Sequence, residues 1–155
     1  MIKINVITSH SNWFSYIKSP NNYIERKIKK LNLKDKKFYK KNFFCSLLLS
    51  NSKEIKKLNK KFRKKNKNTD VLSFPFYSKE MLKKKLRKEK DIYLGDIIIN
   101  LNKVKGKNRI KTFKVEFDQL WIHGLVHLFG YDHKKNSEFF KMNRIEKKYF
   151  KLVNV

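Results

Sequence analysis

The sequence predicts an α/β (α+β) fold, in which a small mixed four-stranded sheet is packed with helices. Four short stretches have the apolar patterns of strands, and segments with helical periodicity stand between and after them. The composition, 40% hydrophobic and 14% aromatic, is that of a globular protein. Because the 155 residues contain no internal repeat and no linker, we expect a single domain over residues 1–155. The order of the strands does not follow from the sequence.

Each of the four predicted strands has its own pattern. Ile2–Thr8 alternates apolar and polar residues, as a strand with one buried face does. Phe43–Ser50 is a short continuous apolar run, which favours a central strand. Thr69–Phe76 is stopped by Pro75, a residue that interrupts sheet pairing, and Tyr93–Leu101 is the fourth strand.

Two helices are predicted in the first half of the chain from apolar residues at helical spacing. The first lies within Ser19–Leu33 and has Pro20 near its start. The second lies within Ser50–Arg63, and one of its first three residues is the expected N-cap, because each has a short polar side chain. The lysine-rich segment Lys34–Asn42 that follows the first helix is expected to be a solvated loop.

Three more helices are predicted in the second half. The charged segment Tyr77–Asp91 is assigned as helical, and its apolar pattern is the weakest of the three. Thr112–Gly130 is a long helix, because its apolar residues recur at the helical period. Asn136–Phe150 is the terminal helix, with Ser137 as its expected N-cap.

The chain is strongly basic, with 40 Lys and Arg against 13 Asp and Glu and a formal net charge of +27. Most of the basic residues are lysine, and the chain contains no alanine. This composition indicates drift toward AT-rich codons at exposed positions. A surface of this charge still attracts polyanions, with an affinity that falls steeply as salt rises. Nucleic acid is therefore the favoured partner.

The chain has one cysteine and no targeting segment. Cys45 stands alone, which excludes an internal disulfide and favours a reducing compartment. The N-terminus has no apolar run of signal-peptide length, and no segment reaches the length of a membrane span. We therefore expect a cytoplasmic protein with no membrane association and no disulfide-linked partner.

Three of the four histidines fall within eleven residues, in the stretch HGLVHLFGYDH. His123 and His127 are four residues apart in a predicted helix, so both side chains leave the same face and can reach one metal ion. Gly130 can adopt the left-handed conformation that ends a helix, which lets the chain turn back and bring His133 toward the same point. Three neutral imidazoles with an open fourth position are typical of a catalytic zinc site, so we predict one Zn²⁺ ion on these histidines.

The spacing of the histidines is that of the metzincin peptidases, but the general base of such enzymes is missing. In H-E-x-x-H enzymes a glutamate after the first histidine takes the proton of the metal-bound water, and here Gly124 holds that position. Asp132 could accept a proton instead, could orient one of the histidines through a hydrogen bond, or could bond only to nearby backbone amides. A site with less need of a strong base, in a basic protein, favours a phosphodiester substrate.

Three motifs occur in order along the chain. Leu58–Phe76 contains LNKKFR and TDVLSFPF, Leu94–Asn100 is LGDIIIN, and His123–His133 is HGLVHLFGYDH. They resemble L-N-x-x-F/Y-R, T-D-V-L-S-F-P, L-G-D-I and H-G-x-x-H-L-x-G-Y-D-H of the YbeY endoribonucleases, the bacterial rRNA maturation factors. Met142 and Glu146 also stand where that family tends to have them. The resemblance covers residues 43–150.

The resemblance implies roles for individual residues. It implies that His123, His127 and His133 bind the zinc ion, and that Arg63 faces the metal cleft, where its guanidinium would hold the scissile phosphate. Arg63 and His123 are accordingly the expected catalytic residues, and Arg63 is the expected substrate-binding residue. Four more residues are expected to shape the cleft: Thr69, Asp70, Ser73 and Asp96.

The resemblance also implies a function. It is that of a zinc-dependent endoribonuclease that acts on single-stranded RNA, in 3′-end maturation of small-subunit ribosomal RNA and in ribosome quality control, with the small ribosomal subunit as partner. Two alternatives stay open. One is a ribosome-assembly or RNA-binding factor whose metal is structural and which cleaves little. The other, disfavoured by Gly124, is a metallohydrolase that acts on peptides or small molecules.

Overall fold

A mixed four-stranded sheet forms the centre of the structure, a computed structural model that describes residues 1–155. The strands lie in the order β1–β2–β4–β3 and comprise β1 (Ile2–Thr8), β2 (Asn42–Ser50), β4 (Asp91–Asn100) and β3 (Val71–Pro75). β1, β2 and β4 are parallel, whereas β3 is antiparallel to β4 and forms one edge. This confirms the predicted mixed four-stranded sheet.

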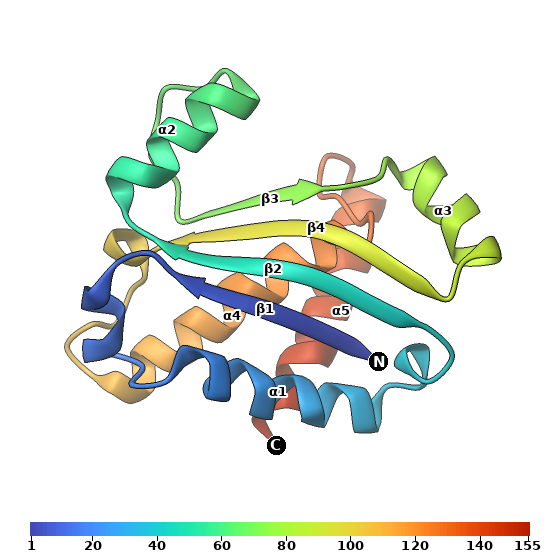
Figure 1. The fold of residues 1–155 in the computed structure, drawn as a ribbon, viewed down its shortest axis with the longest axis horizontal. Helices are drawn as coiled ribbons and strands as arrows, with labels where there is room; N and C mark the ends of the chain where they lie inside the picture. The colour runs from blue at the N-terminus through green and yellow to red at the C-terminus, as the bar shows by residue number, and fades with distance from the viewer.

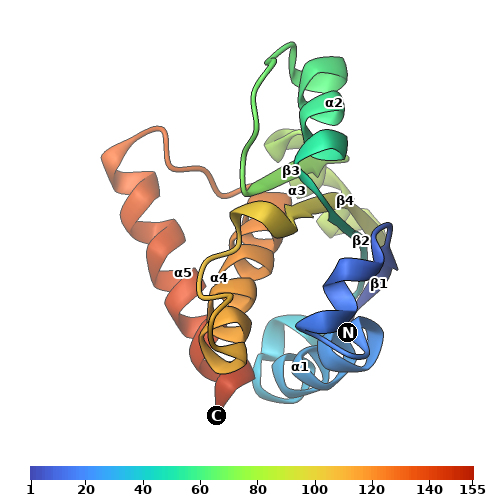
Figure 2. The same ribbon diagram turned by 90° about the vertical axis from the view of Figure 1, so that its left-hand side faces the viewer.

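Helices lie around this sheet and cover one of its faces. α1 contacts β1, α4 contacts β3 and β4, and α5 packs against both helices, so α1, α4 and α5 form a layer. Figure 1 shows α4 and α5 behind the strands, and Figure 2 shows α2 apart from them. None of the helices combines the length and the apolar character that crossing a membrane requires. The α-helices are α1 (Pro20–Lys34), α2 (Ser52–Arg63), α3 (Lys79–Lys88), α4 (Ile110–Leu128) and α5 (Asn136–Asn154), and short 3₁₀ helices are η1 (Ser11–Ser15), η2 (Lys36–Phe38) and η3 (Leu101–Lys103).

The hydrophobic core lies between the sheet and this helical layer. Leu47 of β2 and Ile97 of β4 are fully buried and belong to the same cluster as Phe117 and Trp121 of α4. Full burial of a side chain of this size stabilises the fold by about 1.5–3 kcal/mol relative to its exposure. α4 is thus fixed against β3 and β4, and the side chains on its remaining face keep defined positions.

The starts of two helices test the cap predictions. α2 begins after Asn51, whose side chain accepts a hydrogen bond of 3.0 Å from the backbone N–H of Glu54, so a polar N-cap is confirmed there. The cap predicted for the terminal helix is wrong. α5 already begins at Asn136, so Ser137 lies within the helix, and the N-cap is Lys135, which makes no side-chain cap bond.

The lysine-rich segment after α1 is partly buried, so the predicted solvated loop is wrong at Asp35 and Phe38, which are buried, and at Asn42, where β2 begins. Asp35 accepts a hydrogen bond of 3.0 Å from the backbone N–H of Lys37, which fixes η2. This turn directs Phe38 into the core, where its ring centroid lies 5.9 Å from that of Phe43. The apolar residues of this segment have no periodic pattern, so the burial of Phe38 could not be read from the sequence.

Candidate metal centre

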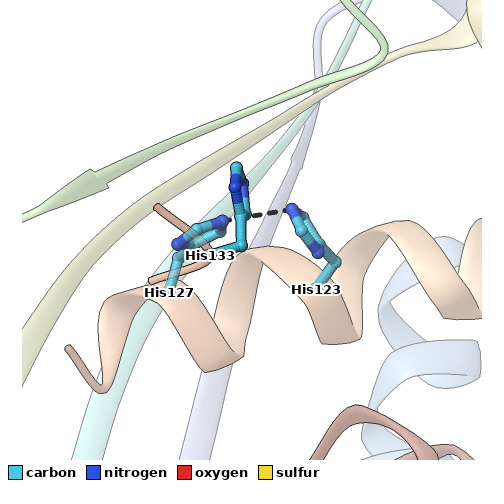
Figure 3. A group of neighbouring side chains, drawn as sticks. All are labelled: His123, His127 and His133. Carbon is cyan, nitrogen blue, oxygen red and sulfur yellow. Dashed lines mark hydrogen bonds between the residues drawn. The ribbon is translucent and has the colours of Figure 1, made fainter. Parts of the chain in front are cut away.

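Three histidine side chains converge beside the end of α4. His123 and His127 lie one turn apart on the same face of the helix, and His133 comes from the segment between α4 and α5 (Figure 3). One ring nitrogen of each lies within 4.8 Å of the others, and the Nε2 atoms of His123 and His127 are 3.1 Å apart. The rings of His123 and His127 are partly buried, and His133 is exposed.

The end of α4 explains how His133 returns to the helix. Gly130 has a φ of 87°, a left-handed conformation that glycine adopts without strain. Its N–H donates to the carbonyl of His127 at 2.9 Å, and the N–H of Tyr131 donates to the carbonyl of Val126 at 3.4 Å. These two bonds are those of a Schellman motif, which reverses the chain at the end of a helix. The predicted role of Gly130 is confirmed.

The same turn fixes which nitrogen of His127 can act as a ligand. The Nδ1 atom of His127 lies 2.9 Å from the carbonyl oxygen of Tyr131. A carbonyl oxygen only accepts hydrogen bonds, so Nδ1 carries the proton and Nε2 keeps a free lone pair. On His123, Nδ1 lies 2.7 Å from Oε1 of Glu146, which leaves the Nε2 lone pair free in the neutral ring. Both free nitrogens therefore point at the same space.

This arrangement fits a bound cation. Two Nε2 lone pairs 3.1 Å apart repel each other unless a positive charge lies between them. Ligands at about 2.0–2.1 Å from a tetrahedral zinc ion are about 3.4 Å apart, close to the separation observed. Burial, followed by the neighbouring His123, lowers the pKa of His127 below its usual value, so His127 is neutral at pH 7 and its lone pair is available. The cluster is suited to hold one metal ion.

Two carboxylates lie beside the cluster, and only one of them contacts a histidine ring. Glu146 of α5 contacts the ring of His123, as described above. Asp132 instead accepts a hydrogen bond of 2.7 Å from the backbone N–H of His133. Of the three possibilities considered for Asp132, the structure has the bond to a local amide. The carboxylate that orients a histidine ring is that of Glu146.

Gly124, which stands in the place of the peptidase glutamate, faces the sheet. A Cβ atom there would lie 2.6 Å from Cγ2 of Ile97 and 3.1 Å from Oγ of Ser73. Ser73 also donates a hydrogen bond of 3.3 Å to the Gly124 carbonyl. Any side chain at this position would push α4 away from β3 and β4, at a cost of about 1–3 kcal/mol for an overpacked core. The position therefore lacks a base because the helix packs too closely on the sheet to hold a side chain.

A cleft of about 800 Å³ lies between α4, β3 and the end of α2, and it contains the histidine cluster. Thr69, Asp70 and Ser73 line it, so their predicted place in the cleft is confirmed. Asp96 does not line it, and that prediction is wrong. Ser73 pairs with Ile97 and Phe74 pairs with Asp96, so Asp96 points to the opposite face of the sheet, where it accepts a hydrogen bond of 2.6 Å from Tyr93.

Arg63 is the last residue of α2 and also lines the cleft. Lys64, with a φ of 56°, ends the helix, and the side chain of Asn59 donates to the carbonyl of Lys67 at 2.9 Å, which holds the following loop. The guanidinium donates a hydrogen bond of 2.6 Å to the carbonyl of Ser73 on the free edge of β3. Its remaining N–H groups are available to an anion.

The charges around the cleft suit an anionic ligand. Three lysines line it together with Arg63, and Asp70 and Asp132 are its only carboxylates. Asp70 is already engaged, because it accepts a hydrogen bond of 2.8 Å from the N–H of Val71. The cations are therefore in excess before any metal is counted. The lysines are Lys65, Lys79 and Lys134.

Comparisons with known proteins agree with one another. The sequence model of a family described as Endoribonuclease YbeY matches residues 9–154. The chain is 43% identical to the Endoribonuclease YbeY of Pelagibacter ubique, over 99% of this chain and 97% of that protein. It is 37% identical to the Endoribonuclease YbeY of Thermodesulfovibrio yellowstonii, over 80% of this chain and 73% of that protein. A solution structure of a Thermotoga maritima protein aligns with a TM-score of 0.54 and 28% identity, over 99% of this chain and 89% of that one.

Proposed function

The chain belongs to the Endoribonuclease YbeY family, and from this premise we propose that it is a zinc-dependent endoribonuclease of single-stranded RNA. We propose further that it acts in the cytoplasm, in 3′-end maturation of small-subunit ribosomal RNA and in ribosome quality control, with the small ribosomal subunit as partner. The observation that carries the proposal is that three imidazoles and a guanidinium line the same cleft.

In this proposal one group of residues holds the metal ion and another binds the RNA. His123, His127 and His133 hold the zinc ion through their free ring nitrogens, and Glu146 and the Tyr131 carbonyl fix two of the rings. A zinc ion so held supplies a Lewis acid and lowers the pKa of a bound water toward neutrality.

Arg63 provides the second half of the site. Its guanidinium, anchored to the Ser73 carbonyl at 2.6 Å, binds the scissile phosphate and stabilises the charge that grows on its oxygens during cleavage. Lys65, Lys79 and Lys134 hold the flanking phosphates without regard to sequence. Gly124 supports a phosphodiester substrate over a peptide, because a glutamate base has no room at that position.

The proposal is tested by cleavage of a labelled RNA, offered as a single strand and as a duplex, at moderate salt. We expect the single strand alone to be cut, a chelator to stop cleavage, and added zinc to restore it. Arg63→Ala should lower kcat by about 10²–10³, the effect of removing one group that stabilises the transition state. Arg87→Ala, a change of an exposed arginine on α3 outside the cleft, is the matched control and should cut at the wild-type rate.

Two outcomes would contradict the proposal. Cleavage that survives chelation would separate the nuclease activity from the histidine cluster. No cleavage of any RNA by the zinc-loaded protein would favour the ribosome-assembly factor with a structural metal.

A further inference from the structure

The face of the sheet opposite to α4 is covered at one end only. There α2 places Ile55 against Leu72 and Ile98, which form a small separate apolar cluster. No helix crosses in front of the rest of this face in Figure 1, where α2 and α3 lie toward its two ends. The side chains that point to this face from the uncovered part of the strands are therefore open to solvent.

A row of aromatic residues crosses this open face. The register places Lys3 of β1 beside Phe44 of β2, and Phe44 beside Tyr93 of β4. Phe76, directly after β3, continues the row, with its ring centroid 5.5 Å from that of Tyr93. Phe44 is 36% exposed and Phe76 is 64% exposed. Large apolar rings gathered on one exposed surface are typical of a binding site.

The aromatic surface continues to the metal cleft. Phe74 of β3 lies two residues before Phe76, so both side chains point to the same face of the sheet. The ring centroid of Phe74 is 5.6 Å from that of Phe62, which is 59% exposed. The guanidinium of Arg63 lies 5.4 Å over the ring of Phe74 and also lines the cleft with the three histidines. Arg63 thus stands at the free edge of β3, where the aromatic surface meets the cleft.

Cations accompany the rings. Lys61 lies 5.2 Å over the ring of Phe62, and Lys3 stands at the far end of the row. Two carboxylates stand beside the row, and both already accept hydrogen bonds: Asp96 from the hydroxyl of Tyr93 at 2.6 Å, and Asp91 from the side-chain amide of Asn42 at 2.6 Å. Rings flanked by positive charges, in a chain of net charge +27, complement a ligand that combines flat bases with phosphates.

We propose that this aromatic surface, formed by Phe44, Tyr93, Phe76, Phe74 and Phe62, stacks the unpaired bases of the RNA substrate. The RNA strand then crosses the free edge of β3 at Arg63, so that the phosphate to be cut enters the metal cleft. Paired bases are stacked inside a duplex and cannot lie on these rings, so the surface also selects single strands. This inference rests on the proposed endoribonuclease function and names where its substrate binds beyond the cleft.

The test uses the full chain with Phe44→Ala and Phe76→Ala combined, because both rings are exposed and their loss leaves the core intact. The matched control combines Phe139→Ala and Phe140→Ala, which removes two exposed rings from α5. Affinity for a single-stranded RNA of about twelve nucleotides, and kcat and KM for its cleavage, are measured for both. A dinucleotide substrate, too short to reach both the cleft and the row, is assayed in parallel.

We expect the Phe44/Phe76 variant to bind the long RNA about tenfold or more weakly, with the change in KM and not in kcat. The loss should be much smaller for the dinucleotide. The Phe139/Phe140 control should bind both like the wild type. Of two single changes, Phe76→Leu should lower the affinity for the long RNA and Phe76→Tyr should keep it. Stacking needs a flat ring and not merely an apolar side chain.

Wild-type affinity and KM in the Phe44/Phe76 variant would overturn the inference. The proposed function would stand in that case, provided that the wild type cuts the RNA. A wild type that cuts no RNA would instead refute the proposed function. The affinities alone would then still decide whether the aromatic row binds single strands.

Discussion

Both histidines on α4 have their Nδ1 atoms occupied. His127 bonds to the Tyr131 carbonyl and His123 to Glu146, so each neutral ring presents Nε2 to the cleft. Such contacts set the tautomer and raise the affinity of the ligand for a metal. Besides the three histidines, Glu146 is therefore a residue on which metal binding depends.

We expect Glu146→Gln to weaken metal binding by about 10–100-fold, because the amide is a weaker acceptor than the carboxylate and no longer raises the basicity of His123. Asp132→Asn should weaken it much less, since Asp132 bonds to the backbone N–H of His133. Glu138→Gln, on the same helix but paired with Lys79 at 3.5 Å, is the matched control. Competition with a chromophoric chelator gives the affinities. Equal losses in the Glu146 and Asp132 variants would contradict the assignment.

The sequence predicted some of the site residues and could not predict others. The convergence of the three histidines could be predicted from the four-residue spacing in a helix and from the glycine that ends this helix, because both are local properties of the chain. The role of Glu146 does not, since it depends on how α5 packs beside α4. The position of Asp96 was predicted wrongly for a related reason: alternate residues of a strand point to opposite faces, and the sequence does not tell which face holds the cleft.

Among the elements, α5 matters to the site because it carries Glu146, and it is tied to the segment after α1 by an ion pair. Lys148 of α5 lies 2.8 Å from Asp35, whose side chain is 8% exposed. Burial by itself would raise the pKa of Asp35, but hydrogen bonds from the Lys148 ammonium and the Lys37 backbone N–H outweigh it and hold the pKa below its usual value. The folded protein therefore favours the charged form of Asp35.

This ion pair predicts a dependence of stability on pH. The folded pKa of Asp35 is lower than that of the unfolded chain, so its contribution is complete above about pH 4 and is lost as the pH falls through the folded pKa. Asp35→Asn should lower the free energy of unfolding by about 1–3 kcal/mol at pH 6, and the difference from the wild type should shrink toward pH 3. Urea titrations across this range measure it. Asp91→Asn, which removes an exposed carboxylate, is the control, and a pH-independent difference for Asp35→Asn would contradict the account.

The type of most elements followed from local patterns, but their arrangement did not. The strands and helices were predicted because apolar spacing reports burial along one segment. The order β1–β2–β4–β3 depends on contacts between distant segments, and central parallel strands such as β2 and β4 have similar apolar runs. Only the edge position of β3 is indicated by a local feature of the sequence: Pro75 lacks the N–H that a central strand donates.

At the scale of the whole molecule, the sheet separates two surfaces that meet at Arg63. One face, with α4, holds the histidine cluster, and the other holds the aromatic row. The net charge of +27 attracts RNA to both, so charge alone does not locate the chemistry. We place the cleavage chemistry at the three histidines.

The most direct test compares RNA cleavage and bound zinc in the wild type, His127→Ala and His10→Ala, purified in parallel and confirmed to be folded by circular dichroism. His10 is the matched control because it lies outside the cluster, beside Asn51 and Glu54. We predict that His127→Ala loses both the zinc and the cleavage, and that His10→Ala keeps both. Cleavage by His127→Ala at the wild-type rate would contradict the central claim, since the activity would then not depend on the histidine cluster.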